Sequence, residues 1–291
     1  STVGTTTLGV GYDAIGNITN KFDAGTEYLY NSPKIHAVEN IKSKIYDYPL
    51  PIYPQYPSNN APNERSDISG DKQQIIYNGI NQPSLIIEGG GVGSNLIKKL
   101  KYIYDIDGNR IKSIYTEENS LGVIDASKTI NRYYLGNYEF EKDANNNITR
   151  QLNYISTPVG LTSILDKESG QADAYFFTYT DHLGSVVTVT DQNAVPVVYQ
   201  SFDAWGRPRS TYDWSYNNIS APPAALNVGF TGHEMLSKFD LINMNGRLYD
   251  PKVGRMLASD NYVHDAFNTQ HFNRYSYVWN NPLKYIDING E

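Results

Sequence analysis

Residues 104–111 read Tyr-Asp-Ile-Asp-Gly-Asn-Arg-Ile, and this unit is the strongest structural signal in the chain. An aromatic residue ends a strand, and the Asp105 carboxylate can accept hydrogen bonds from backbone N–H groups two or three residues on. Gly108 supplies the positive φ where the chain reverses. The β-branched Ile111 then begins the returning strand. The unit therefore predicts a β-hairpin.

The same unit recurs along the whole chain. Full copies and one copy with an extra residue stand at 12–19, 202–207 and 249–255. Degenerate copies stand at 143–148, 181–184 and 286–290. One Asp-x-x-Gly turn is common in β proteins, but this recurrence among aromatic-rich strands indicates a repeat architecture in which each hairpin packs on its neighbours.

Composition supports a β protein and excludes several classes. The 291 residues include 25 Tyr, 9 Phe and 3 Trp, and the net charge is 24 − 31 = −7. A negative chain has no global attraction for nucleic acid or anionic lipid, and no apolar run approaches the roughly 18 residues of a membrane span. With no cysteine, disulfides and thiolate chemistry are excluded. Because the sequence starts at Ser1, we expect a processed product or an excerpt.

From about Tyr179 to the last residue, a series of motifs resembles, in order, the C-terminal core of the bacterial Rhs (rearrangement hotspot), or YD-repeat, family. The matching stretches are Thr-Asp-His-Leu-Gly-Ser-Val at 180–186, Phe-Asp-Ala-Trp-Gly at 202–206, Phe-Thr-Gly-His-Glu at 230–234, Asn-Gly-Arg-Leu-Tyr-Asp-Pro at 245–251, Gly-Arg-Met-Leu at 254–257, Arg-Tyr-Ser-Tyr-Val-Trp-Asn-Asn-Pro-Leu at 274–283 and Asp-Ile-Asn-Gly at 287–290. Upstream, the resemblance rests on the looser YD units.

The resemblance implies an all-β fold, in which antiparallel YD-repeat hairpins spiral into a shell or barrel. A less regular C-terminal plug with short helices closes one end. In such proteins a variable C-terminal domain, often a toxin, follows the core and is held inside the shell. Tc toxin complexes and teneurins use related shells, for holding a cytotoxic segment and for cell-surface adhesion respectively.

We expect two regions, a YD-repeat shell segment and a repeat-associated core. The shell segment covers 1–178, with a Pro-rich loop at 48–63 and a Gly-rich break at 89–93, and the core covers 179–291, with a plug at about 259–291. Short helices are expected within 263–271 and 273–280, where Pro282 would end the second. The aromatic residues at 275, 277 and 279 also alternate as in a strand.

The resemblance also implies a candidate reaction, an aspartic-type self-cleavage near the C-terminus. The matching carboxylates are Asp260 and Asp287, and close carboxylates can share a proton and activate water. Arg255 and Arg274 are expected nearby, where a guanidinium can hold a carboxylate or the cleaved C-terminus. Glu291 falls near the expected cut, so this end would be the product of the reaction. Such an enzyme would turn over once.

Alternatives to this site stay open. The first motif lacks Pro and Gly, the second has Ile288 in place of Pro, and 264–272 reads as an insertion. Both Asp side chains can instead close turns, as the repeat Asp residues do, and both Arg side chains can form structural ion pairs or stack on Tyr275. The five histidines show no ligand spacing, and Ser185 is not in a nucleophile elbow, so we expect no metal and no cofactor.

The sequence thus predicts the C-terminal core of a secreted or surface bacterial protein, closing a shell around a C-terminal cargo or toxin domain. Richness in Asn, Ile and Tyr indicates Bacteroidota. The expected partners are the cargo, other parts of the same shell, and envelope or secretion-system proteins. The alternative is an adhesin, a docked subunit of an envelope or secretion assembly, or a binding module whose aromatic rows stack on glycans.

Overall fold

The structure is a computed structural model, and it describes residues 9–21, 23–25, 27–30, 36, 40–42, 49–50, 63–66, 72–89, 96–158, 160–216, 219, 226–262 and 269–290. The remaining residues include most of the expected Pro-rich loop and Gly-rich break, and the first part of the expected helix at 263–271. Among the described residues, no helix has the length and apolar character needed to cross a membrane.

Twelve consecutive strands form one antiparallel sheet, called the wall here, in which each strand pairs with the next along the chain. They are β6 (Asn63–Ser66), β7 (Lys72–Tyr77), β8 (Pro83–Gly89), β9 (Leu96–Tyr104), β10 (Arg110–Asn119), β11 (Ile130–Leu135), β12 (Tyr138–Lys142), β13 (Ile148–Thr157), β14 (Gly160–Glu168), β15 (Ala174–Thr180), β16 (Val186–Thr190) and β17 (Pro196–Tyr199). One 3₁₀ turn, η1 (Ala126–Lys128), interrupts the series. The all-β prediction is confirmed.

The repeat Asp residues close the hairpin turns. At Asp105, Oδ1 accepts hydrogen bonds from the amides of Asp107 and Asn109, at 2.9 and 2.8 Å, so the bonds reach two and four residues on. The same pair of bonds recurs in the turns that begin at Asp13, Asn78, Asn119, Asp143, Asp181, Asp191 and Asp203. The fourth residue has positive φ, as at Gly108, where φ is +83°. Hairpin geometry explains this preference for glycine.

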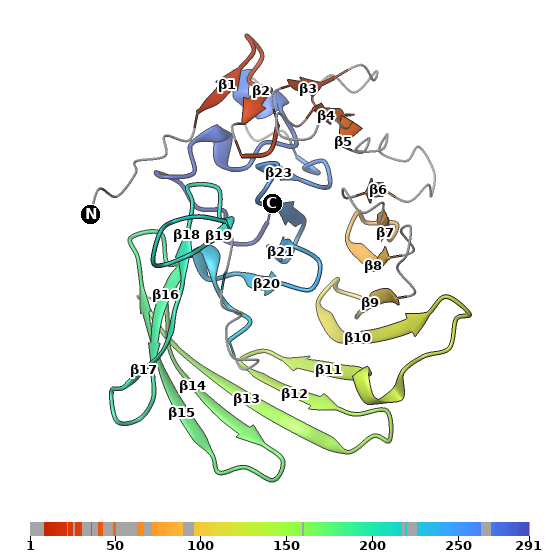
Figure 1. Cartoon of the computed structure of the whole chain (residues 1–291), viewed down its shortest axis with the longest axis vertical. Helices are drawn as coiled ribbons and strands as arrows, with labels where there is room; N and C mark the ends of the chain where they lie inside the picture. The colour runs from red at the N-terminus through yellow and green to blue at the C-terminus, as the bar shows by residue number, and fades with distance from the viewer. Residues whose placement is uncertain are drawn as a thin grey trace.

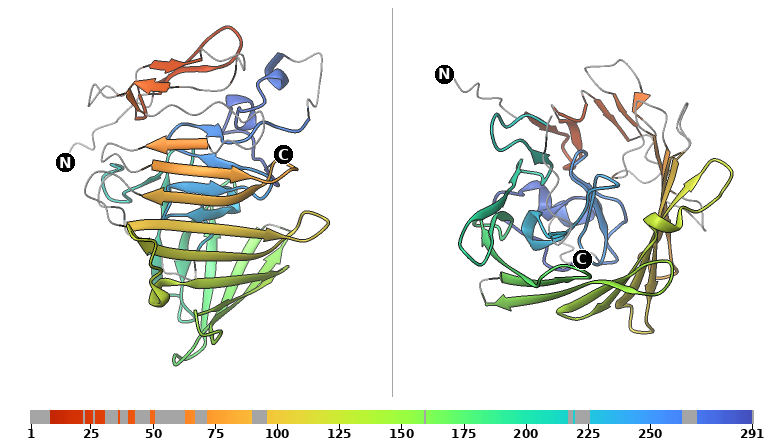
Figure 2. Two further views of the ribbon diagram at one scale, coloured as in Figure 1. Left: turned by 90° about the vertical axis from the view of Figure 1, so that its right-hand side faces the viewer. Right: turned by 60° about the horizontal axis from the view of Figure 1, so that its bottom comes forward.

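The wall curves around residues 226–262 and 269–290, called the inner segment here (Figures 1 and 2). The inner segment carries a four-stranded antiparallel sheet and three 3₁₀ turns. These are β20 (Glu234–Leu236), β21 (Leu241–Asn243), β22 (Leu248–Asp250) and β23 (Arg255–Met256), with η2 (Phe230–Gly232), η3 (Thr269–Phe272) and η4 (Val278–Asn280). The short helices expected late in the chain are therefore single 3₁₀ turns where they are described.

Apolar side chains join the wall to the inner segment. One buried cluster sets Ile86, Leu100 and Tyr115 of the wall against Leu241 and Leu257 of the inner segment. Burial of apolar surface contributes about 25 cal/mol per Å². Because the wall and the inner segment share this core, neither of them buries its apolar side chains without the other.

Charged side chains also cross this junction. Glu234 of β20 pairs with Arg110 at 2.6 Å and with Arg132 at 3.4 Å. Arg132 also pairs with Glu141 at 2.5 Å and lies 3.9 Å from Glu139. Burial raises the pKa of Glu139 to about 7, against the opposing charge of Arg132. Burial also acts to raise the pKa of Glu234, but Arg110 and Arg132 hold it below its usual value.

The N-terminal hairpins pack against the inner segment rather than on the wall (Figure 1). Their strands are β1 (Val10–Tyr12), β2 (Ile18–Lys21), β3 (Glu27–Leu29), β4 (Asn40–Lys42) and β5 (Pro49–Leu50). A separate two-stranded sheet, formed by β18 (Ser201–Phe202) and β19 (Pro208–Arg209), follows the wall in the chain. The Tyr28 hydroxyl donates to the carbonyl of Val253 at 3.2 Å. The Asn273 side chain donates to the carbonyl of Gly16 at 3.0 Å. The expected boundary between 178 and 179 lies inside β15.

Candidate functional site

The guanidinium of Arg247 lies between the two carboxylates that the sequence predicts to form the site. Its Nη2 is 3.3 Å from Oδ2 of Asp260 and 3.5 Å from Oδ2 of Asp287. The side chains of Arg247, Asp260 and Asp287 are only 7%, 13% and 8% exposed, so this is not a surface ion pair. The structure therefore brings Asp260 and Asp287 together, on a shared cation.

The same guanidinium holds the end of the inner segment. Nε of Arg247 donates to the carbonyl oxygen of Gly290 at 2.6 Å, and Nη1 donates to the carbonyl of Arg274 at 3.2 Å. One residue earlier, the Asn289 carbonyl accepts from the amide of Gly246 at 2.8 Å. The last described carbonyl thus points at a positive charge that also contacts both carboxylates.

Gly290 fits this position because of its backbone. Its φ is +76°, and a Cβ there would collide with the carbonyl oxygen of Met244 and crowd the amides of Gly246 and Arg247. The amide of Gly290 donates to Oδ1 of Asp287 at 2.8 Å. Asp287 therefore holds the nitrogen of Gly290, while Arg247 holds its carbonyl.

Both carboxylates also make the local bonds of a turn. Oδ1 of Asp260 accepts from the amide of Tyr262 at 2.8 Å, much as Oδ1 of Asp287 accepts from Gly290. The turn-closing interpretation and the paired-carboxylate interpretation therefore describe different oxygens of the same two side chains. In each case Oδ2 is the atom that faces Arg247.

The two arginines that the sequence singles out lie differently. Arg274 donates through Nε to the main-chain carbonyl of Asp260 at 2.6 Å, and through Nη2 to the same oxygen. The amide of Asp260 donates back to the carbonyl of Arg274 at 2.8 Å. Arg255 lies on β23, where its Nη2 donates to the Tyr30 hydroxyl at 3.3 Å. The structure places Arg274 on the main chain of Asp260 and Arg255 beside the N-terminal hairpins.

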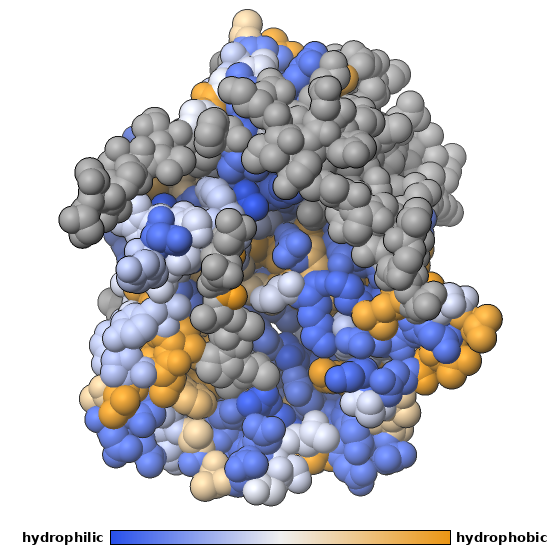
Figure 3. Space-filling view, viewed as in Figure 1, coloured by the Kyte–Doolittle hydropathy of each residue, from blue (hydrophilic) through white to orange (hydrophobic). Residues whose placement is uncertain are grey.

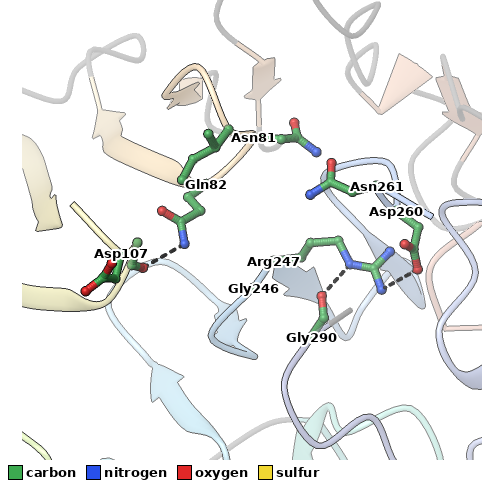
Figure 4. A pocket seen from close by; sticks show the side chains of 10 residues that line it. Asn81, Gln82, Asp107, Gly246, Arg247, Asp260, Asn261 and Gly290 are labelled. Atoms are coloured by element: carbon green, nitrogen blue, oxygen red, sulfur yellow. Dashed lines mark hydrogen bonds and ion pairs between the residues drawn. The ribbon is translucent and has the colours of Figure 1, made fainter. Parts of the chain in front are cut away.

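A cavity of about 210 Å³ opens beside the carboxylates (Figure 4). Its lining residues come from two hairpin turns of the wall and from the inner segment, namely Ile80, Asn81, Gln82, Asp107, Gly108, Gly246, Arg247, Asp260, Asn261 and Gly290. Asp260 lines this space and Asp287 does not. The lining is mainly polar, and Figure 3 shows hydrophilic residues around the hollow of the face viewed there.

Two histidines of the matched motifs make polar contacts with the inner segment. His182 lies with its Nε2 3.3 Å from the carbonyl of Leu283, and His233 lies with its Nδ1 2.9 Å from the Thr231 hydroxyl. Burial lowers the pKa of His233, against the charge of Asp287 and a hydrogen bond with the main chain of Ile288. In the described part of the chain, no group of three or more His, Cys, Asp or Glu side chains is placed to hold a metal ion.

Sequence reasoning missed Arg247. The residue stands inside the quoted motif at 245–251, directly before the fully buried Leu248 and Tyr249. An arginine in such a setting needs partners, because a buried charge without them is costly. An arginine next to these apolar residues thus indicates a carboxylate partner, but the sequence does not identify which carboxylate.

Comparisons with known proteins agree with this architecture. Residues 164–283 match the teneurin YD-shell family. The tRNA(Glu)-specific nuclease WapA of Bacillus subtilis subsp. natto is 27% identical over 192 residues, which is 65% of this chain and 7% of the relative. Salivary gland surface protein 1 of Aedes aegypti is 28% identical over 204 residues, 68% of this chain and 6% of the relative. This chain thus corresponds to a small part of each.

A solved structure extends the likeness to almost the whole chain. The Photorhabdus luminescens Tc holotoxin pore aligns over 97% of this chain and 13% of its own, with a TM-score of 0.67 and 18% identity. The curved wall of repeated Asp-closed hairpins around an inner segment defines a YD-shell protein. The family match, the relatives and the structural likeness together support an Rhs/YD-repeat protein. None of the relatives named here comes from Bacteroidota, and that expectation gains no support.

Proposed function

We propose that this chain is the closing part of a larger YD shell and that it cuts its own backbone between Gly290 and Glu291. One observation carries the proposal: a single guanidinium, that of Arg247, contacts Asp260, Asp287 and the Gly290 carbonyl. A carbonyl that accepts a hydrogen bond from a cation is a better electrophile, and the oxyanion formed on it is stabilised. The site therefore supports hydrolysis of the bond that follows Gly290.

The residues take distinct roles in this reaction. Asp260, which lines the cavity, removes a proton from a water molecule as the water oxygen bonds to the Gly290 carbonyl carbon. The electron pair of the C=O bond moves to the oxygen, which Arg247 stabilises. When the C–N bond breaks, the proton passes from Asp260 to the departing nitrogen of residue 291. The second proton of the water stays on the new Gly290 carboxyl group until the new amino terminus takes it up. The products are then a Gly290 carboxylate beside Arg247 and a protonated amino terminus.

This chemistry differs from the shared-proton dyad that the family resemblance implies. In such a dyad, two carboxylates lie against each other and a proton between them relieves the repulsion. Here the positive charge of Arg247, instead of a shared proton, relieves the repulsion between Asp260 and Asp287. Asp287 positions the reacting group, because its Oδ1 holds the amide of Gly290 and its Oδ2 contacts Arg247.

The test uses the whole gene product, including everything encoded beyond Glu291. Intact masses of the wild type, Asp260→Asn and Asp287→Asn are compared after folding. We expect a wild-type fragment ending at Gly290, no fragment from Asp260→Asn, and slow cleavage in Asp287→Asn. Asp240→Asn, at an exposed turn residue, serves as a matched control that cleaves as the wild type does. An uncut wild type, or cleavage in Asp260→Asn, would refute the proposal.

We further propose that the released chain is a cargo held inside the completed shell. The released chain follows Gly290, the last described residue of the inner segment, and the wall curves around that segment (Figure 2). Toxin-related proteins among the relatives and structural neighbours support a toxic cargo, and the salivary gland surface protein supports a secreted or surface location. Protease digestion of the cleaved product tests this, because an enclosed cargo stays intact until the shell is unfolded.

A second function has one observation in its favour. On β15, Tyr175, Phe177 and Tyr179 are 45%, 43% and 51% exposed, while Phe176 between them packs toward the buried core. Three exposed aromatic rings on one face of β15 form a surface on which sugar rings can stack. Glycan-array binding that is lost in Phe177→Ser supports this binding module. Equal binding signals from the wild type and from Phe177→Ser would rule out glycan binding at this surface.

A further inference from the structure

The wall contributes a side chain to the segment that carries Asp260. The turn between β7 and β8 starts at Asn78, whose side-chain oxygen accepts from the amides of Ile80 and Gln82, at 3.1 and 2.9 Å. Its fourth residue is Asn81, which has a φ of +67°. Gly16, Gly108, Gly184 and Gly206 occupy this position in other repeats. A glycine would serve the turn as well or better, so the Asn81 side chain calls for another explanation.

That side chain reaches out of its own hairpin. Nδ2 of Asn81 donates to the carbonyl of Ser259 at 2.9 Å, and Ser259 directly precedes Asp260. Four residues earlier in the same hairpin, the Tyr77 hydroxyl donates to the carbonyl of Leu257 at 2.9 Å. Two side chains of one wall hairpin therefore hold the carbonyls of Leu257 and Ser259, in the segment between β23 and Asp260.

The inner segment holds the other side of Asp260. Arg274 binds its main-chain carbonyl, its amide donates to Arg274, and its carboxylate pairs with Arg247. Figure 4 shows Asn81 and Gln82 of the wall across the cavity from Arg247 and Asp260. The reacting groups thus come from the inner segment alone, but the backbone before Asp260 is held by the wall.

We propose that Asn81 is a positioning residue for self-cleavage, so that Asp260 reaches its active position only when the β7–β8 hairpin of the wall has closed over the inner segment. The inference rests on the proposed function. Cleavage is then coupled to shell closure, and a chain whose wall is not yet formed keeps its cargo attached. A displacement of even 1 Å at a catalytic group can cost about a hundredfold in rate.

The matched substitutions are Asn81→Gly and Asn146→Gly. Asn146 holds the same fourth turn position between β12 and β13, with a φ of +68°, and it is exposed. Both changes give the turn its usual glycine, and only Asn81→Gly removes the bond to Ser259. Asn81→Asp adds an isosteric test, because its carboxylate has no N–H to donate. In the full gene product we expect Asn81→Gly and Asn81→Asp to slow cleavage about tenfold, with Asn146→Gly unchanged.

A second measurement does not depend on cleavage. Hydrogen exchange of the Asp260 amide is followed in this 291-residue chain, and we expect several-fold faster exchange in Asn81→Gly but not in Asn146→Gly. Unchanged Asp260 exchange in Asn81→Gly would overturn the positioning role, whether or not the wild type cuts itself. Wild-type cleavage with undiminished rates in both Asn81 variants would overturn it as well. An uncut wild type with faster Asp260 exchange would refute the proposed cleavage and leave the wall contact standing.

Discussion

Asp287 and Gly290 are joined by a hydrogen bond of 2.8 Å, in which the amide of Gly290 donates to Oδ1 of Asp287. The other oxygen of Asp287 faces Arg247, and Arg247 in turn donates to the carbonyl of Gly290. Gly290 is therefore held at its amide nitrogen and at its carbonyl oxygen, which belong to the peptide groups before and after it. These two hydrogen bonds limit the positions that the peptide bond after Gly290 can adopt.

The fit of Gly290 gives a first prediction. Gly290→Ala should destabilise the inner segment by more than the cost of its positive φ, because the added methyl meets main-chain atoms of residues 244–247. Gly136→Ala is the matched control, since its φ is +67° and nothing lies within 4 Å of the added Cβ. We expect about 1 kcal/mol for the control and a distinctly larger loss for Gly290→Ala in urea unfolding. Equal losses would mean that the terminal residues are not seated as described.

Removal of Arg247 should cost far more than its conservative replacement. Arg247→Ala leaves two poorly exposed carboxylates side by side without a cation, and loss of one partner of a buried pair costs about 3–5 kcal/mol. Arg247→Lys keeps the charge but lacks the forked donors that reach Asp260, Asp287 and Gly290 together. We expect Arg247→Lys to recover part of the stability and little of the cleavage. Full cleavage in Arg247→Lys would show that a point charge is sufficient.

The pKa of Glu139 predicts a pH dependence of stability. Because the folded pKa, about 7, lies above the usual 4.5, its contribution is complete below about pH 4.5 and is lost as pH rises through 7. Glu139→Gln should remove this loss and stabilise the fold by about 2–3 kcal/mol at pH 8. Chemical denaturation at pH 5 and pH 8 measures it. A gain that is equal at both pH values would contradict the assignment.

Turn residues should differ according to what else they hold. Oδ1 of Asp203 accepts from the amides of Trp205 and Arg207, and Oδ2 accepts from the Tyr216 hydroxyl at 3.0 Å and lies 3.8 Å from Nζ of the buried Lys21. We expect Asp203→Ala to cost about 3 kcal/mol. Asp143→Ala, in an exposed turn of the same geometry, should cost much less. Thermal unfolding of both variants measures the two losses of stability. Similar losses in Asp203→Ala and Asp143→Ala would refute this ranking.

The sequence predicted the repeating part of the fold well, because Asp105 and Gly108 act within a few residues of each other. It also named Asp260 and Asp287, which lie in recognisable motifs. It could not predict that Arg247 lies between them, because that contact depends on how the inner segment folds back on itself. Nor could it single out Asn81, since its partner Ser259 is 178 positions away along the chain.

Self-cleavage by water is tested by following the oxygen atom that hydrolysis must add to Gly290. The full gene product is synthesised by cell-free translation in heavy-oxygen water, so that it folds there for the first time. The C-terminal peptide of the resulting fragment is then analysed by mass spectrometry. We expect a peptide that ends at Gly290 and carries one heavy oxygen in its new carboxylate, and none of this peptide from Asp260→Asn. An uncut chain, a fragment that ends elsewhere, or a Gly290 carboxylate without the heavy oxygen would contradict self-cleavage by water at this site.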